Sequence, residues 1–193
     1  MDKELICKEY EMLHGEIEKK IELQNNLLIF MVTATATIIT IAVESKNLLL
    51  YLFPFFIIIP TMNRITYYRK AIARISAYMI VFLEPKLNGI SWETRNLQLN
   101  RKQYENKRKI KLDYYECPLL SVICYFLYLY ECKAYQLRNF GDFVKMAGPV
   151  FLIAIVIYLT YRINEFSKDR EAMMNSWKNI ETIEPANKKS RLN

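Results

Sequence analysis

Apolar and polar residues fall in long separate blocks along this chain, instead of alternating with the short period of a soluble amphipathic helix. Residues 27–43 and 48–62 are apolar runs, separated only by the polar link 44–47. A membrane-spanning helix needs roughly 20 predominantly apolar residues, and the polar and aromatic residues beside each run bring both close to that length. We therefore expect residues 27–62 to form a first transmembrane hairpin.

A second hydrophobic hairpin is predicted over residues 118–162. Its first arm, 118–131, is rich in tyrosine and shorter than a usual span. The last run begins at Ala147, is apolar all round and ends at Arg162. A surface helix of a soluble bundle would keep charges on its outer side, so this pattern favours the membrane. The predicted fold class is an all-α integral membrane protein with two transmembrane hairpins, about four spans.

Residues 1–26 predict a cytoplasmic amphipathic helix. Apolar or uncharged residues recur there every three or four positions: Ile6, Tyr10, Leu13, Ile17, Ile21 and Gln24. No proline interrupts this segment, so we expect it to run directly into the first span. Its stripe can pack on the rest of the chain or on copies of the protein as a short coiled coil.

Charge predicts the topology. Residues 63–117 form a basic, helical region and residues 163–193 a polar tail, whereas the link 44–47 holds a single lysine. Cytoplasmic segments of membrane proteins are enriched in Lys and Arg. This places both termini and the central region in the cytoplasm. The basic link 132–146 fits an outside position poorly.

Composition argues against catalysis. The chain of 193 residues has a formal net charge of +7, one histidine (His14), four glycines and four cysteines without CxxC pairing. It contains no glycine-rich phosphate loop, nucleophile elbow or HExxH sequence. We therefore expect no enzyme, no cofactor and no metal site.

Threonines mark the first span. At about 100° per residue, Thr33, Thr37, Thr40 and Glu44 fall within one narrow wedge of a helix. Threonine hydroxyls can simply bond to the carbonyl four residues earlier, and small residues ease helix packing. Alternatively the wedge lines a pore or a subunit interface, with Glu44 as a charge ring at its mouth. Both interpretations remain open at this stage.

A basic segment follows residue 94. Between residues 95 and 111 there are seven Lys or Arg and one acid. Such residues make charge-assisted bonds to phosphates, and nearby aromatics such as Trp92 and Tyr104 could stack on bases. Attraction to anionic lipid explains the same composition. The candidate ligand contacts for a nucleotide or oligonucleotide are Arg95, Arg101, Lys102, Lys107, Arg108 and Lys109.

The segment Ile75-Ser-Ala-Tyr-Met-Ile-Val-Phe-Leu-Glu84, followed by Trp92-Glu-Thr-Arg95, resembles small bacterial membrane proteins of antiphage operons. The layout over residues 20–115 is similar to the SLATT class, in which a transmembrane hairpin joins a cytoplasmic helical region, and to the membrane effector of the Hailong system. The resemblance implies an oligomeric channel that opens when the signal made by a partner nucleotidyltransferase changes.

The sequence thus leads to two functional hypotheses. The first is a homo-oligomeric, pore-forming effector of the bacterial inner membrane, used in antiviral defence and gated by a nucleotide signal. The second is a non-conducting membrane anchor that recruits a soluble partner through its basic helices.

Overall fold

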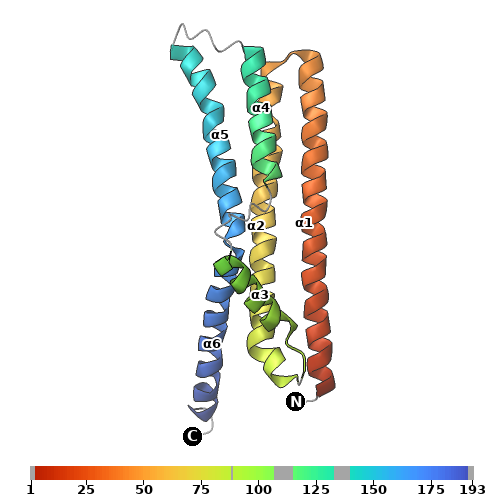
Figure 1. Ribbon diagram of the computed structural model, residues 1–193, viewed down its shortest axis with the longest axis vertical. Helices are drawn as coiled ribbons and strands as arrows, with labels where there is room; N and C mark the ends of the chain where they lie inside the picture. The colour runs from red at the N-terminus through yellow and green to blue at the C-terminus, as the bar shows by residue number, and fades with distance from the viewer. Residues whose placement is uncertain (1–2, 88, 107–114, 133–139, 191–193) are drawn as a thin grey trace. The chain divides into compact units, whose positions relative to one another are not determined.

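The computed structural model describes residues 3–87, 89–106, 115–132 and 140–190, and these are folded into helices joined by short turns (Figure 1). The predicted all-α class is confirmed for this part of the chain. Six α-helices are present there: α1 (Lys3–Ser45), α2 (Pro54–Tyr78), α3 (Trp92–Asn106), α4 (Glu116–Cys132), α5 (Phe140–Asn164) and α6 (Phe166–Ser190).

Helix α1 runs unbroken from the polar N-terminal segment into the first apolar run, as predicted. It ends at Ser45, and Lys46 adopts a left-handed backbone conformation with φ of 51°. A residue of this kind commonly terminates a helix because it redirects the chain. Asn47 then starts the short helix η1 (Leu48–Leu52), its side chain accepting a hydrogen bond from the backbone N–H of Leu49 at 3.2 Å. Glu44 therefore belongs to α1 and not to the link.

Helix α2 joins the second apolar run to the following basic segment without a break, with Pro60 inside it. The π-helical turn η2 (Met79–Leu83) and the 3-10 turn η3 (Glu84–Lys86) extend its end. Pro85 stands in that last turn, and Gly89 takes a φ of 97° in the connection to α3, a conformation that glycine adopts without steric cost.

Contacts divide the chain into two compact units. The apolar unit comprises residues 23–67 and 112–164, and the polar unit comprises residues 1–22, 68–111 and 165–193. Helices α1 and α2 contribute residues to both units.

In the apolar unit, neighbouring helices alternate in direction, as the two predicted hairpins require (Figure 1). All four long helices contribute to one buried core: Met31, Phe55, Ile58, Met62, Ile65, Cys117, Cys124, Val156 and Ile163. Cys117 lies 3.9 Å from the sulfur of Met31. A smaller cluster of Ala42, Tyr51 and Tyr128 packs η1 against α4.

The polar unit has its own apolar core. It is built by the first part of α1, the end of α2 and the turns that follow: Ile6, Ile17, Ile72, Met79, Leu83 and Leu87. The predicted N-terminal stripe therefore packs on the same chain over much of its length, although Ile21 is exposed. The tail predicted for residues 163–193 contains helix α6, which the sequence analysis did not anticipate.

Among the described residues, three helices are long and apolar enough to cross a membrane: α1, the helix of residues 48–86, and Met146–Asn164 within α5. This supports a membrane protein. Helix α4, which contains the predicted span 118–131, is not one of these three, so four spans stay a prediction.

Candidate functional site

The predicted pore-lining residues share one exposed face of α1. Thr33, Thr37, Thr40 and Glu44 are all exposed, whereas Thr35, on a different face, is fully buried. The threonine face is thus turned away from the core of its own chain. Met31 and Ala42 mark the opposite, buried side of the same helix.

Each hydroxyl of this face donates to a carbonyl of the preceding turn. The bonds run from Thr33 to Ile29 at 2.9 Å, from Thr37 to Thr33 at 2.9 Å and from Thr40 to Ala36 at 3.0 Å. Back-bonding satisfies the hydroxyl donors, which lets these residues lie in an apolar environment. Because the proton points to the backbone, the oxygen lone pairs remain as acceptors for water or a cation. The geometry is compatible with both interpretations of the threonines.

The predicted ligand contacts do not form one cluster. Arg95 and Lys102 are exposed and seven residues apart on α3, hence on one face. Arg101 lies on another side of the helix, its Nε 4.0 Å from the carboxylate of Glu171 on α6, and both side chains are substantially exposed. Lys107, Arg108 and Lys109 lie outside the described residues. Trp92, 63% exposed at the start of α3, shares the face of Arg95 and Lys102.

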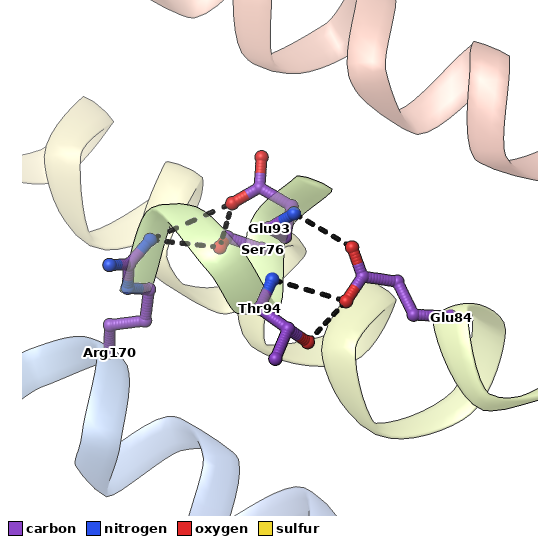
Figure 2. Close-up of polar contacts among 5 residues, drawn as sticks. All are labelled: Ser76, Glu84, Glu93, Thr94 and Arg170. Carbon is purple, nitrogen blue, oxygen red and sulfur yellow. Dashed lines mark hydrogen bonds and ion pairs between the residues drawn. The ribbon is translucent and has the colours of Figure 1, made fainter. Parts of the chain in front are cut away.

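A buried polar network that the sequence analysis missed lies inside the polar unit (Figure 2). Glu84, only 7% exposed, accepts hydrogen bonds from the backbone N–H groups of Glu93 at 2.7 Å and Thr94 at 3.1 Å. The Thr94 hydroxyl also donates to the same carboxylate. The first turn of a helix has unsatisfied N–H donors, and here a glutamate from the preceding turn caps them. The N-terminus of α3 is consequently closed by Glu84 and does not offer these donors to a ligand.

The second half of the network joins α6 to the rest of the polar unit. Arg170 on α6 lies 3.6 Å from Glu93, with side chains 3% and 7% exposed. The hydroxyl of Ser76 on α2 donates to the Glu93 carboxylate at 2.7 Å and accepts a bond from Arg170 at 3.4 Å. One residue from each of three helices therefore meets at this point (Figure 2).

Burial and the charges of this network shift the pKa values of two residues, Arg170 and Tyr10. Burial lowers the pKa of Arg170, and the nearby carboxylates of Glu93 and Glu171 oppose that effect. Burial, with the negative charges of Glu84 and Glu93, raises the pKa of Tyr10 on α1. The Tyr10 hydroxyl is buried and has no hydrogen-bond partner among the described residues. The phenol therefore stays neutral beside two acids.

Aromatic packing holds α6 next to this network. Trp177 lies edge-on to Tyr78 and Phe82, with ring centroids 5.5 Å and 6.0 Å apart. Its indole N–H donates to the carbonyl of Arg74 at 3.3 Å. Tyr78 in turn donates to Glu9 of α1 at 2.8 Å.

The sequence gives only a weak indication of this buried polar network. Glu84 ends an apolar stretch directly before Pro85, and a glutamate that is buried there needs a partner. Arg170 lies in a segment that reads as polar throughout, so nothing in the local pattern separates it from its solvated neighbours. Chemically, the network can fix the arrangement of α3 and α6.

Comparisons with known proteins give no further assignment: no protein-family model, curated protein or solved structure matches this chain.

Proposed function

We propose that this protein is a homo-oligomeric, pore-forming effector of the bacterial inner membrane, gated by a nucleotide or oligonucleotide signal that its polar unit senses. The observation that carries the proposal is the exposed threonine face of α1. A helix long enough to cross the bilayer turns Thr33, Thr37 and Thr40 away from the core of its own chain. In an oligomer that face lines an aqueous path, with Glu44 at one end.

The proposal includes four spans, with both termini in the cytoplasm. Helix α4 has a stripe of large exposed apolar side chains, Leu119, Ile123, Phe126 and Tyr130, at helical spacing. Exposing such a stripe to water is unfavourable, because transfer of apolar surface out of water lowers the free energy. Its 17 residues span about 26 Å at 1.5 Å per residue, close to the hydrocarbon thickness of a bilayer.

Sensing is assigned to the face of α3 that presents Trp92, Arg95 and Lys102. An exposed indole can stack on a base, while the two cations suit phosphate oxygens. The cap provided by Glu84 keeps this helix in place without using those side chains. The role in antiphage defence, and a nucleotidyltransferase as the source of the signal, rest on the resemblance to SLATT-type and Hailong-type effectors.

A non-conducting anchor is the second candidate, favoured by a different observation. The polar unit has its own core, and α3 exposes Trp92 and Leu99 at 63% and 56%. Exposed aromatic residues with flanking arginine are typical of protein interfaces. In this hypothesis α3 binds a soluble partner and no ions pass.

Reconstitution of the full chain in liposomes tests the proposal. Potassium flux is measured with no ligand and after addition of linear or cyclic oligonucleotides. The proposal predicts an oligomer whose flux changes on ligand addition. A stable oligomer that passes no ions under any of these ligands would contradict the channel and support the anchor.

A further inference from the structure

Arginine and tyrosine pair at one end of the apolar unit. On α2, the guanidinium carbon of Arg64 lies 5.1 Å from the ring centroid of Tyr67. On α5, Arg162 donates a hydrogen bond to the hydroxyl of Tyr158 at 3.3 Å. Both arginines directly follow the apolar segment of their helix, and each precedes a buried core isoleucine, Ile65 or Ile163.

The two pairs lie at the same end of the unit. Helices α2 and α5 each return from the turn of a hairpin, so they run in the same direction (Figure 1). The end of their apolar segments is also where the apolar segment of α1 begins and where α4 starts. Among the charged side chains described in this unit, Arg64, Arg162 and Glu116 lie at this end. The other end holds Glu44, Lys46 and Glu131.

The surface around these pairs changes along the helices from tyrosines, which carry a polar hydroxyl, to purely apolar side chains. Tyr67, Tyr158 and Tyr161 are 60%, 56% and 60% exposed. Phe151 and Ile157 continue the exposed surface of α5 toward its other end, at 68% and 54%. Tyrosines gather where a membrane protein meets the headgroup layer, since the ring is apolar and the hydroxyl polar. Arginine at the same depth suits the phosphate of a lipid.

We propose that Arg64 with Tyr67, and Arg162 with Tyr158, form two binding sites for the headgroups of anionic phospholipids. The tyrosine holds each guanidinium at the helix surface, where its planar array of donors faces phosphate oxygens. The apolar surface beyond each pair receives the acyl chains, with Phe56 exposed on α2 (75%) and Phe151 and Ile157 exposed on α5. A soluble phosphate compound would explain the arginines but not the apolar surface that adjoins them. The inference needs only the membrane location and is independent of channel activity.

The thermal stability of the purified full chain in detergent tests this assignment. Phosphatidylglycerol, phosphatidylcholine and inorganic phosphate are added separately, and the shift in Tm is measured. We expect phosphatidylglycerol to raise Tm, and phosphatidylcholine or inorganic phosphate to raise it much less. The double variant R64Q/R162Q should lose the phosphatidylglycerol-dependent shift, while R95Q/K102Q, with equal charge loss on α3, should keep it.

Two results overturn the assignment. One is an equal phosphatidylglycerol shift in R64Q/R162Q and wild type. The other is an equal shift of the wild type with inorganic phosphate, which shows that a soluble anion suffices. Native mass spectrometry of the wild type gives a readout that does not depend on a variant folding. It should show phosphatidylglycerol retained in preference to phosphatidylcholine, and equal retention of the two lipids contradicts the proposal.

Discussion

Arg170 and Glu93 form an ion pair 3.6 Å apart with almost no access to water, 3% and 7% of their side chains being exposed. Removing one partner of such a pair leaves a buried charge without compensation, which costs about 3–5 kcal/mol. We predict a loss of that size in the free energy of unfolding for Arg170→Met. Unfolding by denaturant is followed in the full chain through Trp177 fluorescence, with Trp92→Phe as the background.

The double variant Arg170→Met with Glu93→Gln provides the control. A neutral amide in place of the carboxylate can still accept the bond from Ser76, so most of the loss should be recovered. The free energy of unfolding lost in the double variant can be compared with the sum of the losses in Arg170→Met and Glu93→Gln alone. If the two values are equal, the charges act independently and the network does not couple α6 to α3.

Glu84 caps helix α3 through the amides of Glu93 and Thr94. Loss of an N-cap side chain costs about 0.5–2 kcal/mol, so Glu84→Ala should destabilise the polar unit by that amount. Hydrogen exchange should accelerate first at the amides of Glu93 and Thr94. Lys86→Ala, an exposed change in the same turn, should stay within about 0.5 kcal/mol of wild type. Unchanged exchange at both amides in Glu84→Ala would rule out the cap.

The hydroxyl of Tyr10 is buried without a partner among the described residues. A buried, unsatisfied polar group costs about 1–3 kcal/mol, so Tyr10→Phe should leave the free energy of unfolding unchanged or raise it by about 1 kcal/mol. Tyr78→Phe is the matched change, because Tyr78 donates to Glu9 at 2.8 Å. It should lower stability by about 0.5–1.5 kcal/mol. Equal losses in both variants would show that Tyr10 has a bonding partner.

Tyr10 also predicts a response to alkaline pH. Burial, together with Glu84 and Glu93, raises its pKa above the ordinary value of 10.0 in the folded chain. In the unfolded chain the phenol ionises first, so this contribution to stability is complete below pH 10 and declines as pH rises through the folded-state pKa. Tyr10→Phe should therefore lose less stability than wild type above pH 10. Parallel stability curves for the two proteins would contradict the raised pKa.

The features that the sequence predicts depend on local patterns, and the features that it misses depend on contacts between distant segments. The helical class, the continuity of α1 and the first hairpin follow from long apolar blocks and from the absence of breaking residues, both of which are local properties. The partners of Glu84 and Arg170 depend on contacts between segments far apart in the chain, 94 residues in the case of Ser76 and Arg170. Helix α6 was missed because its polar composition resembles a solvated tail, while its docking depends mainly on Trp177 and Arg170.

The predicted pore-lining and ligand-binding residues differ in the same respect: the first set follows from a local pattern, and the second depends on distant contacts. A helix period suffices to place Thr33, Thr37 and Thr40 on one face, and the structure adds that this face is exposed. A count of basic residues could not separate Arg101, which approaches Glu171, from Arg95 and Lys102 on another face of α3.

Ion flux through paired variants of α1 tests the central claim most directly. Thr37 and Val32 are both exposed on α1 but lie on different faces. Each is replaced by leucine, and single-channel currents of the full chain are recorded in planar bilayers. The proposal predicts that Thr37→Leu lowers the conductance, since it replaces an acceptor oxygen of the pore wall with an apolar side chain, whereas Val32→Leu leaves it unchanged. Equal conductance in wild type, Thr37→Leu and Val32→Leu would show that the threonine face does not line a pore.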